Sequence, residues 1–215
     1  DGLSRVKIEF PWMGDKVETD WSPVAAVGAG KQMGLQWIPA VGDQVIVCFE
    51  HGDVNRPYVL GSLWSGTDKP PETNKSVVGS DGKVDLIEIK SREGQTFKIN
   101  DKPKSREIGI SGPTNSGKII IKHDDKSIEI DSNGDVTIKG TNKITVEGKD
   151  IDLKSSGNLT LDASSNITLK AGRNLSLKGL KADLEGSQSA SVKGAQAALE
   201  GSAMTTIKGG LVKIN

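Results

Sequence analysis

The chain has 215 residues, and its 28 Lys and Arg are balanced by 28 Asp and Glu, giving a formal net charge of zero. This balance disfavours a protein that binds a polyanion such as nucleic acid. A single cysteine excludes an internal disulfide framework, and no apolar run approaches the roughly 20 residues of a membrane-spanning helix.

The N-terminal part has the composition of a globular β domain. Val6–Phe10 alternates apolar and charged side chains, Val45–Phe49 is an apolar run that follows a turn at Val41–Asp43, and Tyr58–Trp64 is a further strand. The loop Glu50–Pro57 between the last two is rich in turn residues. This spacing favours an OB fold, a barrel of five short antiparallel strands, over residues 1–70.

Side chains of this domain carry further expectations. All four Trp lie within residues 1–64, and we expect them in the barrel core and in contacts between copies of the chain. Cys48 is expected to pack as a small hydrophobic side chain. The segment Thr67–Asn74 reads as a linker. Residues 71–126 then form a neck with short strands, for example at Leu86–Ile89 and Ile119–Ile121.

From residue 127 to residue 215 one short pattern occurs twelve times, at steps of seven or eight residues. Each repeat has two apolar or small residues that flank a single residue, then a charge, then a small residue, except that the last repeat ends at Asn215. The pattern predicts one short strand with a buried face, followed by a corner. The flanking pairs are Ile128/Ile130, Val136/Ile138, Ile144/Val146, Ile151/Leu153, Leu159/Leu161, Ile167/Leu169, Leu175/Leu177, Ala182/Leu184, Ala190/Val192, Ala197/Leu199, Thr205/Ile207 and Val212/Ile214.

A single repeat cannot fold alone. Ordering eight residues costs about 8–16 kcal/mol of backbone entropy, whereas burying two aliphatic side chains returns about 3–6 kcal/mol. Every strand therefore needs neighbours on both edges. One chain could coil on itself with three repeats per turn, or three identical chains could wind together. We favour the trimer, because a two-residue stripe makes a thin core that closes best around a threefold axis. Its shaft would be about 55–60 Å long.

The second members of the pairs are the expected core of this trimer. The last residues of the chain are expected to form the terminal plug or to bind a separate cap. The trimer core comprises Ile138, Val146, Leu153, Leu161, Leu169, Leu177, Leu184, Val192, Leu199 and Ile207, and the tip comprises Leu211, Val212, Ile214 and Asn215.

Several segments of this sequence resemble a known family. Arg5–Trp12, Gly34–Asp43, Val45–Glu50, Gly52–Pro57 and Gly61–Trp64, followed by Lys69–Pro71 and the repeat, look like the valine-glycine repeat (VgrG) spikes of type VI secretion and their relatives in phage baseplates and extracellular contractile injection systems. The resemblance implies an all-β homotrimer in which an OB-fold barrel is followed by an intertwined triple-stranded β-helix that punctures a target membrane.

The resemblance also implies partners. A PAAR-type tip protein would sit at the C-terminal end, and tube and baseplate proteins would bind through a large N-terminal hub portion, which is absent from these residues. Assembly in the bacterial cytoplasm would precede injection outside the cell or into a target cell. The target membrane is a transient partner, and neither nucleic acid nor a cofactor is expected.

Motifs that would indicate a specific chemistry are present only in part. Gly112–Lys118 fits the first seven positions of a P-loop, but Ile119 replaces the Ser or Thr that binds magnesium and a strand follows instead of a helix. Asp131–Asp135 hints at a calcium loop without its final Glu. His51 and His123 lack ligand-spaced partners, so no metal site and no catalytic site is expected.

Two other functions remain open. The chain could be a phage tail-spike component, or an OB-type ligand-binding module on a fibrous stalk. Against a nucleic-acid ligand, residues 1–70 contain six Lys and Arg but nine Asp and Glu, whereas a nucleic-acid groove needs a basic stripe.

Overall fold

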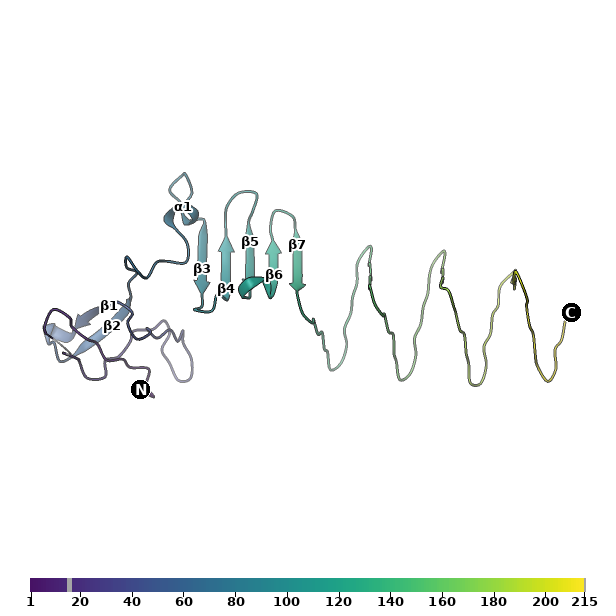
Figure 1. Ribbon diagram of the computed structural model, residues 1–215, viewed down its shortest axis with the longest axis horizontal. Coiled ribbons are helices and arrows are strands. Elements are labelled where there is room, and N and C mark those ends of the chain that lie inside the picture. The colour runs from purple at the N-terminus through teal and green to yellow at the C-terminus, as the bar shows by residue number, and fades with distance from the viewer. Residues whose placement is uncertain (15–16, 215) are drawn as a thin grey trace. The chain divides into compact units, whose positions relative to one another are not determined.

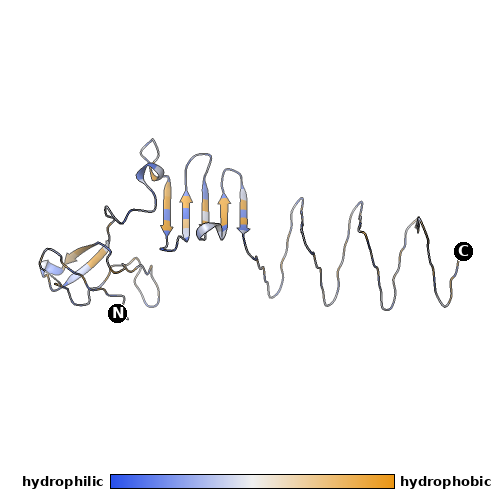
Figure 2. Ribbon diagram, viewed as in Figure 1, coloured by the Kyte–Doolittle hydropathy of each residue, from blue (hydrophilic) through white to orange (hydrophobic). Residues whose placement is uncertain are grey.

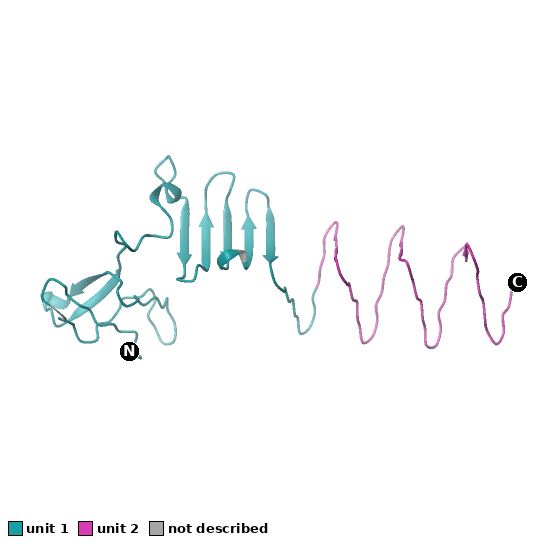
Figure 3. Cartoon of the chain, in the orientation of Figure 1, with its two compact units in different colours: residues 1–144 teal, residues 145–215 magenta. Residues whose placement is uncertain are grey.

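A computed structural model describes residues 1–14 and 17–214 (Figure 1). The chain divides into two compact units, residues 1–144 and residues 145–215 (Figure 3). Within the described residues, no helix combines the length and the apolar character that crossing a membrane requires.

The N-terminal region is built around one antiparallel hairpin. Strand β1 (Val45–Phe49) pairs with β2 (Pro57–Ser62), and the register shifts between Ile46 and Val47. Both predicted strands are confirmed, although the second ends at Ser62 rather than Trp64. The loop between them contains a short 3-10 turn, η1 (Glu50–Gly52). The predicted turn before β1 is also present, since the N–H of Asp43 donates to the carbonyl of Ala40 at 3.1 Å.

The remaining barrel strands are reduced to short bridged segments in this single chain. Val6 exchanges two backbone hydrogen bonds with Ser22, at 3.0 and 2.7 Å, and the N–H of Thr19 donates to the carbonyl of Ile8 at 2.9 Å. The predicted strand Val6–Phe10 therefore pairs with residues 17–22 only at isolated bridges. The region is all-β, as the sequence indicates, but among the described residues of this region only β1 and β2 are assigned as strands and the other pairings are isolated bridges.

A small apolar core holds this region together. Ile8, Phe10 and the fully buried Val59 form its centre. Alternation along β1 directs Val45, Val47 and Phe49 towards this centre.

Two expectations about side chains in this region are corrected. Cys48 is exposed rather than packed, because it lies on the outer face of β1. All four Trp are 44–80% exposed, so in this chain they are not core residues. The core is too small to enclose these large side chains. Their expected contacts with other copies stay a prediction.

A second sheet follows the one-turn helix α1 (Asn74–Val77). Its five strands are antiparallel and follow chain order, so it is a meander (Figure 1). It includes the first repeat of the C-terminal pattern as its last strand, so the sheet continues past the expected start of the needle at residue 127. The strands are β3 (Leu86–Lys90), β4 (Thr96–Asn100), β5 (Glu107–Ser111), β6 (Gly117–Lys122) and β7 (Ser127–Ser132), with a 3-10 turn η2 (Pro113–Asn115) before β6.

Residues 133–214 follow an extended course without assigned strands. Every residue of this stretch is exposed, and unit 2, taken by itself, runs as a zigzag (Figure 3). The apolar pairs of the repeat therefore have no core within one chain.

Candidate functional site

One face of the five-stranded sheet is apolar and uncovered. The strand registers align its side chains in two rows across all five strands, and Figure 2 shows orange hydrophobic positions alternating with blue hydrophilic ones along β3 and β4. Except for the half-buried Ile99, every member is exposed. Such a face is unusual on a protein that stays monomeric. The rows are Ile89, Phe97, Ile110, Ile119 and Ile130, and Ile87, Ile99, Ile108, Ile121 and Ile128.

The opposite face of this sheet is mostly polar, with Leu86 and Ile120 as its apolar members. The Glu129 carboxylate contacts the Lys118 ammonium at 2.5 Å and the Lys122 ammonium at 2.6 Å. Hydrogen bonds from Lys118 and then Lys122 lower the pKa of Glu129 from 4.5 to about 2, and Glu129 in turn raises the pKa of Lys122. The hydroxyls of Thr96 and Ser111 also lie within hydrogen-bond distance on neighbouring strands. The polar face is thus suited to contact with water, and the apolar face is suited to burial against another surface.

This ion cluster predicts an acid-sensitive sheet. A carboxylate whose pKa is depressed on folding stabilises the fold fully above its ordinary pKa, and this stabilisation is lost as the pH falls towards the folded value. We therefore expect the wild-type chain to lose stability between pH 4.5 and about 2, and Glu129→Gln to lose less over the same window. Urea midpoints followed by circular dichroism measure the difference.

Glu93→Gln is the matched control for this prediction, because Glu93 is an exposed turn residue that forms an ion pair with its neighbour Arg92. It should leave the acid response of the wild-type chain unchanged. Equal acid responses for Glu129→Gln and the wild type would contradict the assignment.

The sheet also ends in an unpaired edge. In the strand order, β7 is a terminal strand that pairs with β6, so the backbone groups on its other side have no ladder partner among the described residues. Such an edge is a template for a strand from another chain. The edge lies on the first repeat, where the C-terminal pattern begins.

The predicted core residues of the needle are not brought together in the single chain. Their side chains, from Ile138 to Ile207, are 60–79% exposed. Leu211, Val212 and Ile214 of the predicted tip are exposed too, and Asn215 lies outside the described residues. The single chain thus presents these apolar pairs without a partner surface.

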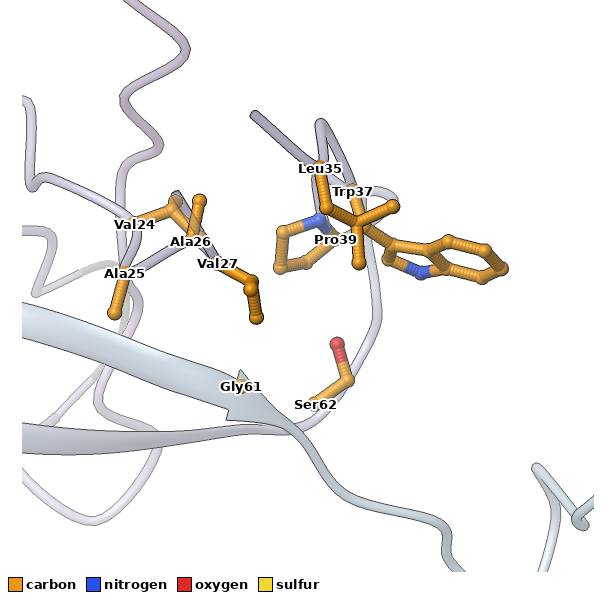
Figure 4. Close-up of a pocket in the computed structure, with 9 residues that line it drawn as sticks. All are labelled: Val24, Ala25, Ala26, Val27, Leu35, Trp37, Pro39, Gly61 and Ser62. Atoms are coloured by element: carbon orange, nitrogen blue, oxygen red, sulfur yellow. The ribbon is translucent and has the colours of Figure 1, made fainter. Parts of the chain in front are cut away.

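The N-terminal region carries a small open groove of about 160 Å³ (Figure 4). Val24 to Val27 line one side, Leu35, Trp37 and Pro39 line the other, and Gly61 and Ser62 lie at the end of β2. No titratable side chain is among its described lining residues. The groove offers packing surface rather than acid–base chemistry.

The weaker sequence motifs adopt ordinary structures. The P-loop-like segment forms η2 and then enters β6, so the expected strand at Ile119–Ile121 is confirmed. Asp131 lies in β7, and the N–H of Gly134 donates to the Ser132 hydroxyl at 3.1 Å, as in a local turn. Among the described residues, no three or more His, Cys, Asp or Glu side chains form a cluster suited to a metal ion.

The apolar sheet face is a candidate interaction surface that the sequence analysis did not predict. Its signal was present, because Ile87 and Ile89, Phe97 and Ile99, and Ile108 and Ile110 repeat the spacing of two seen in the C-terminal pattern. The turns between these pairs differ in length, so the pairs do not recur at a fixed period. For that reason they were not recognised as one continuous pattern with the C-terminal repeat.

Comparison with known proteins identifies a domain family that matches the N-terminal region. Residues 1–64 match the type VI secretion system/phage-baseplate injector OB domain. The chain is 35% identical over 105 residues to the type VI secretion system spike protein VgrG2a of Pseudomonas aeruginosa, which is 47% of this chain and 12% of that protein. It is 39% identical over 77 residues to the actin cross-linking toxin VgrG1 of Vibrio cholerae, which is 34% of this chain and 7% of that protein.

A longer alignment reaches the spike protein VgrG1a of Pseudomonas aeruginosa, at 25% identity over 130 residues, which is 56% of this chain and 20% of that protein. In each of these three alignments, the matched part spans a fifth or less of the relative's own length. Residues 1–64 therefore match the injector OB domain family, and part of the chain is similar to the VgrG spike proteins of type VI secretion.

Proposed function

We propose that this chain is the protomer of a trimeric spike of a contractile injection machine. Three copies place their OB domains, residues 1–70, side by side as a collar, and the neck of residues 71–126 connects each to the shaft. Residues 127–215 of the three copies wind into a triple-stranded β-helix. The shaft transmits the force of contraction to a target membrane, and the role is mechanical rather than enzymatic.

The observation that carries this proposal is the uncovered apolar surface that continues through two consecutive parts of the chain. In the five-stranded sheet two complete rows of Ile and Phe side chains are not covered by other parts of the chain. In the repeat that follows, the apolar pairs are exposed as well. One copy cannot cover either surface. Three copies related by a threefold axis can, because three sheets with one apolar face each enclose a prism.

The backbone supports the same arrangement. The free edge of β7 is positioned to accept the second repeat of another copy, and each later repeat accepts the next. Every strand then has a ladder partner on both sides, which the entropy of ordering a short repeat requires. The hydrogen bonds that join the three chains make the shaft stiff along its length.

The two ends of the spike have different partners. We assign Leu211, Val212, Ile214 and Asn215 to the surface that receives a PAAR-type tip protein, as the resemblance to the VgrG spikes implies. The side chains of Leu211, Val212 and Ile214 are exposed in the single chain and so available to such a partner. Tube and baseplate proteins would bind through a hub portion of the kind that the family resemblance implies. The particle would assemble in the bacterial cytoplasm and then leave the cell during injection.

Disulfide trapping tests the proposed winding. In the trimer each repeat lies beside the following repeat of another copy, so Thr160 of one copy neighbours Thr168 of the next. Parallel strands about 4.8 Å apart place such residues within disulfide range. In a Cys48→Ser background, Thr160→Cys with Thr168→Cys should therefore oxidise to a covalent trimer of three 22.7 kDa chains on a denaturing gel.

Thr160→Cys with Ser176→Cys is the matched control, because these positions are two repeats apart and should give no covalent trimer. Light scattering of the wild-type chain should give three times the mass of one chain. A monomeric mass, or a cross-link confined within one chain, would instead support a self-coiled chain and overturn the spike.

Ligand binding by residues 1–70 distinguishes this proposal from one of its two alternatives. The matched domain family includes phage baseplates as well as type VI secretion, so a phage tail-spike component remains the second candidate. Specific binding of an oligonucleotide or a glycan to residues 1–70 of the intact chain would favour a ligand-binding module. The mechanical role predicts no such binding.

A further inference from the structure

The charge that follows each apolar pair alternates in sign along the chain. Eleven repeats carry such a charge, and only Lys170 and Lys178 are consecutive charges of the same sign. Nine of the ten consecutive pairs are therefore opposite in sign. The series is Asp131, Lys139, Glu147, Lys154, Asp162, Lys170, Lys178, Glu185, Lys193, Glu200 and Lys208.

These charges occupy equivalent positions in every repeat, one residue after the apolar pair. When the pairs of adjacent strands stack, the charges stack as well, because they share one offset from the pair. In the intertwined trimer the neighbour of each repeat is the following repeat of another copy. The alternation then places a carboxylate beside an ammonium at nine of ten steps along each corner of the shaft.

Two other ways of placing the repeats side by side give fewer pairs of opposite charge. If two copies slip by one repeat, each charge meets the charge two repeats away, and seven of the nine resulting pairs are alike in sign. If one chain coils on itself, each charge meets the charge three repeats away, and three of eight pairs are alike in sign. Like charges directly opposite on neighbouring strands are destabilising.

The five-stranded sheet already places an opposite charge beside the first charge of the series, although Lys118 lies closer to Glu129, at 2.5 Å. Asp131 is the first charge of the series, and its register partner on β6 is Lys118. The Lys118 ammonium and the Asp131 carboxylate are 3.9 Å apart. The other edge of β7 is free for a strand whose charge is positive, as Lys139 is.

We propose that the alternating charges set the register in which three copies of this chain wind together, by pairing each repeat with the next repeat of a neighbouring copy and opposing a slip. The partner is thus a second copy of the same chain, and the interaction surface is the corner line of the shaft. The inference rests on the proposed trimeric spike and specifies how its chains recognise one another.

Two variants with the same net charge test this ladder. Lys193→Glu places like charges beside both Glu185 and Glu200. The fivefold variant reverses every charge from residue 178 onward, which restores alternation throughout and removes the Lys170–Lys178 mismatch. Both changes lower the formal charge of the chain by two. The five substitutions are Lys178→Glu, Glu185→Lys, Lys193→Glu, Glu200→Lys and Lys208→Glu.

We expect Lys193→Glu to lower the melting temperature of the trimer at low salt, whereas the fivefold variant should melt at or above the wild-type temperature. The deficit of Lys193→Glu should shrink in about 1 M salt, where charges are screened within about 3 Å. In the disulfide assay, Lys193→Glu should also increase the slipped cross-link between Thr160→Cys and Ser176→Cys.

The possible results separate the two proposals. If the wild-type chain is a trimer but the fivefold variant melts as low as Lys193→Glu, the charge ladder is overturned and the spike is not. The same conclusion follows if Lys193→Glu melts at the wild-type temperature. A monomeric wild-type chain would overturn both.

Discussion

Leu161→Asp should abolish trimer assembly. In the proposed shaft Leu161 lies on the inner side of the fifth repeat, so the substitution places three carboxylates around the axis at one level. Each buried, unpaired charge costs several kcal/mol even after the surrounding structure relaxes. Three of them together equal or exceed the about 5–15 kcal/mol by which proteins are typically stable. We expect monomers or aggregates by light scattering, with loss of β-sheet signal in circular dichroism.

Thr160→Asp is the matched control for Leu161→Asp. It adds the same charge one residue away, on the outer side of the same strand, so it should form a trimer with a melting temperature close to that of the wild type. Wild-type assembly by Leu161→Asp would refute the inward placement of the second members of the pairs, and equal damage by both variants would refute the alternation of faces.

Ile110→Asp should have the second-largest effect. Ile110 lies in the middle of the apolar face, with Phe97 and Ile119 as its register partners, and it is 58% exposed in the single chain. An Asp at such a position would cost little in a monomer, because water still reaches it. Against two other copies it becomes buried and unpaired, so we expect the trimer to dissociate at concentrations where the wild type stays assembled.

Ser111→Asp controls for the added charge on the opposite face of the same strand, where Lys118 is the register partner on β6. Sedimentation over a range of chain concentrations measures the association of both variants. If Ile110→Asp associates as tightly as Ser111→Asp, the apolar face is not the contact between copies and must serve another partner.

Local patterns in the sequence were sufficient to predict several elements. Val45–Phe49 is a strand because it is a short apolar and β-branched run bounded by turn residues, and the structure places β1 there with the same bounds. The strand nature of Ile119–Ile121 followed in the same way, and this excluded a phosphate-binding helix after the P-loop-like segment. These predictions succeeded because the determining forces act within a few residues.

Predictions that depended on distant contacts were less accurate. The exposed positions of the four Trp and of Cys48 depend on which face of each segment meets the core, and the core of this region is small. The apolar face of residues 86–132 could not be read from any one segment, since it exists only when five strands adopt a common register. Register is set by the turns together with the face that is buried.

By itself, the sequence determined the β character of the region before residue 133, the position of the repeat and the order of its charges, because alternation, turn residues and sign are properties of neighbouring positions. The tertiary structure alone decided that β3 to β7 combine two apolar rows on one face and that the first repeat closes this sheet with a free edge. The physical reason is that a face and an edge are created by pairing strands, and pairing joins residues that no local pattern relates.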